Sequence, residues 1–170
     1  MKPPVLDACL AALPYAYPWS NLVADFKFHQ RPGWAASFAS LLRAAPWVEP
    51  ALDAADLLLP MPLSEQRLRE RGYNQADVLA RALEPAKVAR GVLLRVQDTP
   101  PQRTLARSER LRMVQNAFAV DPLQVSRIAG KRLVLLDDVM TSGASLHAAA
   151  RVLRGVGAAH ITGLVLSRTE

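Results

Sequence analysis

The chain has 170 residues, the usual size of a single domain with its own core. Hydrophobic residues make up 51% and charged residues 21%, which excludes a disordered chain, and no apolar run is long enough to span a bilayer. The net charge is +6, and 17 of the 21 basic residues are arginine, which suits a polyphosphate ligand or a nucleic acid as well as simple solubility.

The first residues, MKPPVLDACLAALP, do not match a secretion signal. They carry one lysine, and their short apolar run is broken by Asp7 and Pro14. Cys9 is the only cysteine, which excludes an internal disulfide and a cysteine-based zinc site. We therefore expect a cytoplasmic protein.

The N-terminal third is predicted to be mainly helical. Four prolines in residues 1–20 exclude a long helix there, and residues 13–17 are interpreted as a short edge strand. The spacing of apolar residues then predicts a short helix over 19–29 and a clearer one over 34–44.

An apolar strand is predicted at 57–59, followed by a stiff loop. The strand ends at residues 60–62, Pro-Met-Pro, because proline cannot donate to a sheet ladder. Ser64 is a good helix N-cap and Gly72 a good helix end, so we predict a helix over 65–71. A pyrophosphate would suit this loop and helix, although the arginines could equally be solvated helix charges. The candidate pyrophosphate-binding residues are Pro62, Ser64, Arg67 and Arg71.

The middle of the chain holds a helix, a strand and a long polar loop. Asn74 is predicted to cap the helix, and residues 91–95 to form the strand. The loop that follows, VQDTPPQRTLARSER, has a length typical of lids or disordered segments, and its arginines would let it close over an anion. The candidate lid residues are Thr99, Gln102, Arg103 and Arg107.

The stretch 133–145, LVLLDDVMTSGAS, carries the strongest pattern for function. Its apolar residues predict a strand buried on both faces, as in a parallel sheet, where ligands bind at the C-terminal strand ends. Asp137 and Asp138 lie at that end, and helical spacing follows over 145–154. A glycine in the intervening loop lets backbone N–H groups approach an anion, beside the positive end of the helix dipole.

This combination predicts a site for a phosphorylated sugar. The two aspartates can accept hydrogen bonds from a vicinal diol. The candidate 5′-phosphate residues are Thr141, Ser142, Gly143, Ala144 and Ser145. A nucleoside triphosphatase is disfavoured because the chain has no Gly-x-x-x-x-Gly-Lys-Ser/Thr sequence. An ordinary buried strand before a capped helix is the remaining alternative, but it leaves the hydroxyl–glycine loop unexplained.

The stretch resembles the phosphoribosyl diphosphate (PRPP) signature of type I phosphoribosyltransferases. Together with four further segments, it makes nearly the whole chain similar to the ComF family of competence-associated proteins. These segments are Lys27-Phe28, Pro60-Met61-Pro62-Leu63, Arg71-Gly72-Tyr73-Asn74-Gln75 and Asp98-Thr99-Pro100-Pro101-Gln102. The resemblance implies an α/β fold: a mostly parallel, Rossmann-like sheet flanked by helices. It also implies one domain, with residues 1–54 as an N-terminal hood and 55–170 as the PRPP-binding core.

The resemblance also implies chemistry. We expect transfer of a phosphoribosyl group from PRPP to an unknown acceptor base or amine, with release of pyrophosphate. Asp137 and Asp138 would hold the ribose and Mg²⁺, the metal largely through the ligand and water. The alternative is a non-catalytic, PRPP-regulated protein that handles single-stranded DNA or binds DNA-uptake proteins.

Three features depart from the family pattern. The N-terminal four-cysteine zinc module of many members is absent from this sequence. Ser142 and Ser145 stand where threonine is more usual, which keeps the hydroxyl groups, and Met113 replaces a common asparagine.

Overall fold

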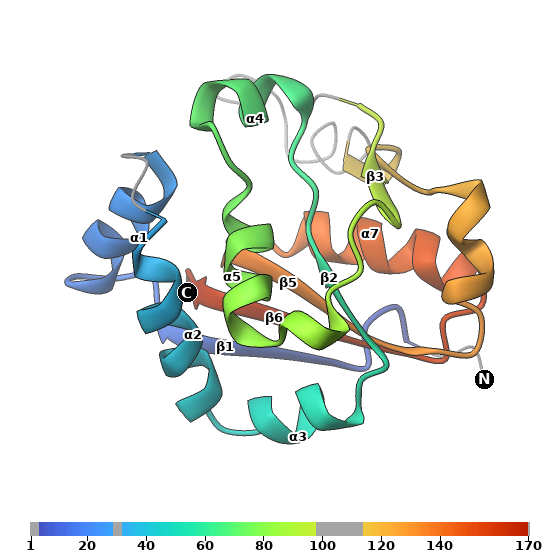
Figure 1. The fold of residues 1–170 in the computed structure, drawn as a ribbon, viewed down its shortest axis with the longest axis horizontal. Helices are drawn as coiled ribbons and strands as arrows, with labels where there is room; N and C mark the ends of the chain where they lie inside the picture. The colour runs from blue at the N-terminus through green and yellow to red at the C-terminus, as the bar shows by residue number, and fades with distance from the viewer. Residues whose placement is uncertain (1–3, 29–31, 98–113, 170) are drawn as a thin grey trace.

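The computed structural model describes residues 4–28, 32–97 and 114–169, and it contains a central four-stranded sheet (Figure 1). The strands lie in the order β1-β6-β5-β2, and every neighbouring pair is parallel. Their bounds are β1 Ala8–Pro14, β2 Leu57–Pro60, β5 Arg132–Met140 and β6 His160–Arg168. The predicted fold class, a mostly parallel sheet flanked by helices, is confirmed.

Helices cover both faces of this sheet. The helices are α1 Trp19–Phe28, α2 Trp34–Ala44, α3 Val48–Ala54, α4 Glu65–Arg71, α5 Gln75–Leu83 and α7 Ala144–Gly155, with short 3₁₀ turns at Pro85–Lys87 and Pro122–Arg127. None of the helices in the described ranges is long and apolar enough to cross a membrane.

The alternation of side chains along β5 divides the core into two. Leu133 and Leu135 face one cluster, which they share with α7 and with a small antiparallel pair, β3 Leu93–Arg95 and β4 Phe118–Val120. Val134 and Leu136 face the other cluster, which they share with α1, α2, α3 and α5. A strand buried on both faces reads as a continuous apolar run, which is the pattern that the sequence carries here.

Two N-terminal elements differ from the sequence prediction. The edge strand lies at Ala8–Pro14, paired with β6 from Ala8 to Pro14, and not at residues 13–17. Its alanines have a weak strand preference, so the pairing with β6 decides its position. The sequence also gave no signal for α3, which has no side-chain cap and begins after Trp47 in the left-handed region, at φ 68°.

The unequal lengths of β5 and β2 create the crevice in which the site lies. β2 ends at Pro60, opposite Leu136, and the Met61 N–H donates to the Leu136 carbonyl at 2.8 Å. β5 continues alongside β6 as far as Met140. Asp137 and Asp138 are therefore inside β5, and not after it as predicted, at the point where the neighbouring β2 has turned away.

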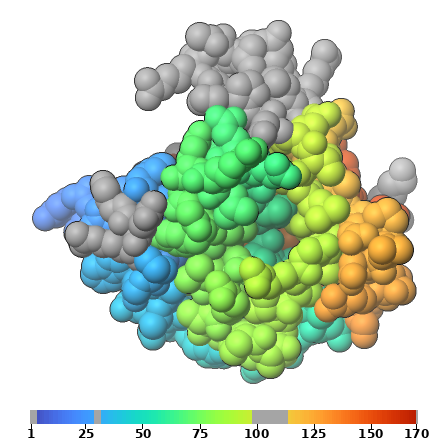
Figure 2. Space-filling view, turned by 45° about the horizontal axis from the view of Figure 1, so that its top comes forward, coloured from blue at the N-terminus to red at the C-terminus, as the bar shows by residue number. Residues whose placement is uncertain are grey.

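The segment after β2 forms one wall of this crevice. Figure 2 shows the green surface of α4 standing between the blue N-terminal helices and the yellow-green segment of β3. The predicted helix over 65–71 is confirmed, as are its cap and its end. The Ser64 hydroxyl accepts from the Arg67 N–H, and Gly72 closes the helix at φ 79°.

Candidate functional site

A hollow at the C-terminal ends of β2 and β5 brings together six of the residues proposed from the sequence. They are Pro62, Arg67, Arg71, Asp137, Asp138 and Ser145. They come from the loop after β2, from α4, from β5 and from the start of α7. Members of the candidate diol, pyrophosphate and phosphate groups thus border a single hollow.

Asp137 and Asp138 are fixed by the backbone that follows them. The Asp138 N–H donates to Asp137 Oδ1 at 2.8 Å, and the Val139 N–H donates to Asp138 Oδ1 at 2.7 Å. Burial, together with the charge of Asp138, raises the pKa of Asp137 from 3.8 to about 8. Two carboxyl groups this close do not both ionise easily, so a ligand that supplies donors or positive charge would be favoured.

Asp138 has one oxygen that accepts no hydrogen bond from the described part of the chain. Its side chain is buried, and the oxygen concerned is Oδ2. Lys27 Nζ lies 3.4 Å from that oxygen. A buried carboxylate oxygen without a hydrogen bond costs free energy, so this atom is suited to receive a ligand hydroxyl or a cation.

Arg71 supplies positive charge on the other side of the hollow. Its burial lowers its pKa from the ordinary value, while the carboxylates of Asp138 and Asp137 oppose the change. Its guanidinium donates to Gln75 Oε1 at 3.0 Å. Because the normal pKa of arginine is so high, the group stays charged and can bind phosphate oxygens.

The loop from β5 to α7 has the backbone of an anion site. Gly143 is in the left-handed region, at φ 73°, and an added Cβ would lie 3.3 Å from Met140 Sδ. Gly143, the N-cap of α7, makes no side-chain cap, and Ser142 Oγ accepts from the Ala144 N–H at 3.4 Å. The first N–H groups of a helix have no acceptor within the helix and are well placed to bind an anion.

Several candidate residues do not border the hollow. Thr141, Ser142 and Gly143 lie in the loop before α7, and Ala144 is the first residue of that helix. Ser64 is buried, and its hydroxyl is used as the cap of α4. Thr99, Gln102, Arg103 and Arg107 lie outside the described residues.

The hollow also includes four polar residues that were not proposed from the sequence: Lys27, Asn74, Gln75 and Arg95. A lysine in the last turn of a short helix is easily read as a surface charge that complements the helix dipole. Asn74 is the predicted cap of α5, and its Nδ2 also donates to the Met61 carbonyl at 3.0 Å. The Arg-Gly-Tyr-Asn-Gln sequence was the available signal, since it places Asn74 and Gln75 beside Arg71.

The donor set decides which metal could bind. Within the described residues there is no group of three or more His, Cys, Asp or Glu side chains that could hold an ion. A closed protein cage is therefore excluded for this part of the chain. Two neighbouring carboxylates do suit Mg²⁺, which keeps several waters and takes phosphate oxygens from its ligand.

Comparison with known proteins agrees with this geometry. The model of the phosphoribosyl transferase domain matches residues 68–168. A solved structure described as the allosteric regulatory enzyme of purine biosynthesis aligns with 84% of this chain and 30% of its own, at a TM-score of 0.50 and 16% identity. At that identity, the likeness shows the fold alone.

Relatives with more similar sequences come from bacteria. Competence protein F of Haemophilus influenzae is 32% identical over 155 residues, which cover 86% of this chain and 66% of that protein. The DNA utilization protein YhgH of Salmonella typhimurium is 31% identical over an alignment of 175 residues, which covers 99% of this chain and 75% of that protein. Competence protein ComFC of Bacillus subtilis is 34% identical over 114 residues, which cover 66% of this chain and 45% of that protein. The chain therefore belongs to the ComF family of competence-associated proteins, which is built on a phosphoribosyl transferase domain.

Proposed function

We propose that the hollow binds Mg²⁺ and PRPP, and that the protein transfers the phosphoribosyl group to an acceptor base or amine with release of pyrophosphate. The observation that carries this proposal is the position of Asp137 and Asp138. They border one hollow together with Ser145, at the start of α7, and with Arg67 and Arg71 of α4. PRPP has the matching order of groups: a 5′-phosphate, a ribose diol and a pyrophosphate.

Each end of the ligand has a partner of suitable chemistry. The 5′-phosphate would accept from the N–H groups and hydroxyls of residues 141–145, where the positive end of the α7 dipole adds to the attraction. The pyrophosphate would face Arg67 and Arg71, beside Pro62. The ribose hydroxyls would donate to Asp137 and Asp138, including the Asp138 oxygen that accepts no hydrogen bond among the described residues.

The proposed metal would be held by the same carboxylates, largely through water and the ligand. When bound, Mg²⁺ neutralises negative charge on the pyrophosphate and so makes it a better leaving group. It would also offset the repulsion from Asp138, which adds to burial in raising the pKa of Asp137.

The chain's own residues would act on the transition state. As the bond to pyrophosphate lengthens, positive charge builds on the ribose, and the carboxylates beneath it stabilise that charge. Arg67 and Arg71 stabilise the departing pyrophosphate. No covalent intermediate with the protein is needed. We assign recognition of the acceptor to the proposed hood, residues 1–54, and keep residues 55–170 as the proposed core.

A second candidate function is a PRPP-regulated protein that handles single-stranded DNA without catalysis. It is favoured by the names of the relatives, which refer to competence and to DNA utilization. The surplus of arginine could follow a phosphate backbone. Pyrophosphate release in the presence of an acceptor separates the two candidates, because only the enzyme produces it.

Calorimetric titration of Mg²⁺–PRPP tests the site that both candidates share. We expect binding by the unmodified protein and none by the Asp137→Asn, Asp138→Asn double variant. Asp53→Asn removes an exposed carboxylate of α3, near the opposite end of β2, and is the matched control. Unchanged affinity in the double variant would overturn the site. A screen of nucleobases and amines for pyrophosphate release then tests turnover.

A further inference from the structure

The N-terminal helix α1 places a lysine inside the hollow. Lys27 is in the last turn of α1, its side chain is 21% exposed, and its Nζ lies 3.4 Å from Asp138 Oδ2. Lysine in a last turn normally extends into water, where its ammonium group is strongly hydrated. Here it borders the same hollow as Arg71 and Asp137. A residue far from the PRPP signature in sequence therefore contributes a cation to the site.

The end of α1 is held by two side chains, Tyr73 just before α5 and Gln75 at its first position. The last carbonyl groups of a helix have no partner within the helix. Here the Tyr73 hydroxyl donates to the Phe26 carbonyl, and Gln75 Nε2 donates to the Lys27 carbonyl at 3.2 Å. The rings of Tyr73 and Phe26 also make an edge contact, with centroids 6.0 Å apart. These two hydrogen bonds hold the backbone at the end of α1 in place, and with it the direction in which the Lys27 side chain extends.

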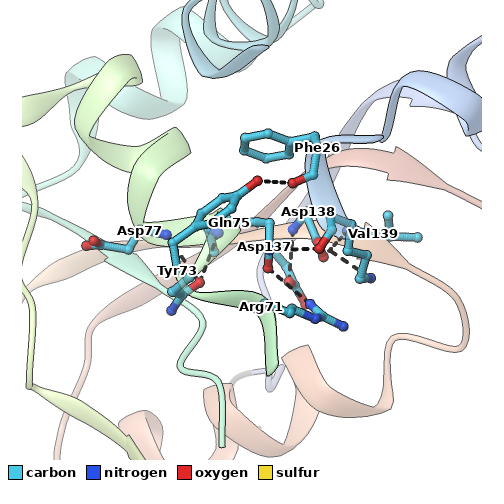
Figure 3. A network of polar contacts seen from close by, with 11 residues as sticks. Phe26, Arg71, Tyr73, Gln75, Asp77, Asp137, Asp138 and Val139 are labelled. Atoms are coloured by element: carbon cyan, nitrogen blue, oxygen red, sulfur yellow. Dashed lines mark hydrogen bonds and ion pairs between the residues drawn. The ribbon is translucent and has the colours of Figure 1, made fainter. Parts of the chain in front are cut away.

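This arrangement continues to the arginine on the pyrophosphate side. Gln75 is 1% exposed, and its Oε1 accepts from Arg71 NH1 at 3.0 Å. The Arg71 guanidinium also lies 5.3 Å from the centre of the Phe28 ring, at the end of α1. Figure 3 shows Tyr73 directed at Phe26, and Arg71 directed at the pair formed by Asp137 and Asp138. The buried side-chain amide of Gln75 therefore links Arg71, on the proposed pyrophosphate side, to the backbone of Lys27.

Capping of α1 alone would not require this arrangement. A cap is complete when the carbonyl groups have donors, and water or a surface residue can supply them. Placing an ammonium group in a partly desolvated hollow, beside a carboxylate, costs free energy that a solvated lysine avoids. Residues that retain such a cost gather at binding sites.

We propose that Lys27 contacts the bound PRPP and that Tyr73 and Gln75 are positioning residues that hold its helix end in place. This inference rests on the proposed function, because it names a further contact in that same site. In the ligand-free protein Lys27 pairs with Asp138. When PRPP binds, the Lys27 ammonium group pairs with a phosphate oxygen of the ligand. Asp138 Oδ2 is then free to accept a hydrogen bond from a ribose hydroxyl.

Calorimetric titration of Mg²⁺–PRPP with Lys27→Met is the first test. Loss of a charged contact to phosphate should weaken binding by roughly 10- to 100-fold. Lys131→Met is the matched control, since Lys131 precedes the other end of β5, is 48% exposed and pairs only loosely with Asp56 at 3.9 Å. The control should bind PRPP as the unmodified protein does. Equal or tighter binding by Lys27→Met would overturn the inference.

A double-mutant cycle tests the positioning role. Tyr73→Phe removes one hydroxyl and keeps the ring contact with Phe26. It should weaken binding by roughly fivefold in the unmodified protein, and by less than about twofold in the Lys27→Met background. A purely structural role of Tyr73 would give the same loss in both backgrounds, and that result would overturn the positioning role. Tyr17→Phe, at a side chain that is 83% exposed, is the control and should change neither value.

The two levels of the proposal fail in different ways. If the unmodified protein does not bind Mg²⁺–PRPP, the proposed function and this inference both fall. If the unmodified protein binds, the aspartate double variant does not, and Lys27→Met binds normally, only the inference falls. Thermal melting of each ligand-free variant establishes that it is folded before any affinity is compared.

Discussion

Replacing Asp137 by asparagine should make the ligand-free protein more stable while it abolishes PRPP binding. The raised pKa means that the folded protein holds a proton on this carboxyl group that the unfolded chain releases at neutral pH. Between the unfolded value near 3.8 and the folded value of about 8, stability therefore falls as pH rises. Asparagine removes that dependence and keeps the oxygen that accepts from the Asp138 N–H.

The size of the gain follows from the difference between the two pKa values. At about 1.4 kcal/mol per pH unit, the three units between 3.8 and 7 set an upper limit of about 4 kcal/mol. Asp137 is only half-buried, so partial hydration reduces the gain to about 2–4 kcal/mol. For a chain of this length, we expect the melting temperature at pH 7 to rise by about 5–10 °C.

Thermal melting at several pH values is the assay. The advantage of Asp137→Asn should shrink to about 1 kcal/mol at pH 5 and disappear near pH 4, where the carboxyl group is protonated in both states. Asp53→Asn, at an exposed carboxylate of α3, is the control and should not stabilise the protein. A variant that is less stable than the unmodified protein at pH 7, or a gain that does not depend on pH, would refute the reasoning.

Three further predictions concern the walls of the site. Gly143→Ala should destabilise the protein by about 1–2 kcal/mol in urea unfolding, because its positive φ and the Met140 sulfur 3.3 Å from the new Cβ both oppose a side chain; unchanged stability would argue against the loop geometry. Ser64→Ala should cost about 1 kcal/mol through loss of the α4 cap, whereas Ser64→Asp, which keeps a capping oxygen, should cost less. Removing Mg²⁺ with a chelator should weaken PRPP binding at least tenfold in calorimetry, and retention of full affinity would contradict the proposed metal. Replacing Arg67 and Arg71 by methionine should also weaken binding at least tenfold, and retention of full affinity would contradict the assigned pyrophosphate side.

The sequence was sufficient for those parts of the site that depend on local chemistry. The cap at Ser64, the helix end at Gly72 and the cap at Asn74 follow from side-chain and backbone preferences within a few residues. That Asp137 and Asp138 lie near the C-terminal end of a buried strand follows from the apolar run before them, although β5 itself continues to Met140. These features require no knowledge of distant segments.

The rest depends on contacts between segments far apart in the chain. Lys27 borders the hollow at the end of α1, where Tyr73 and Gln75, almost fifty residues later, bind the last carbonyl groups of the helix. The edge strand was placed five residues too late because its partner, β6, sets its register. Neither fact leaves a local trace that spacing or composition could reveal.

The position of β6 has a consequence for the order in which the molecule can fold. β6 lies between β1 and β5, and Ala8 of β1 pairs with Thr162. A chain emerging from the ribosome cannot attach β1 to the sheet until residues 160–168 have been made. Until then the apolar residues of β1 stay exposed or are covered by another protein. Because the pairing of β1 with β6 forms late and joins distant segments, folding should be slow for a chain of this size.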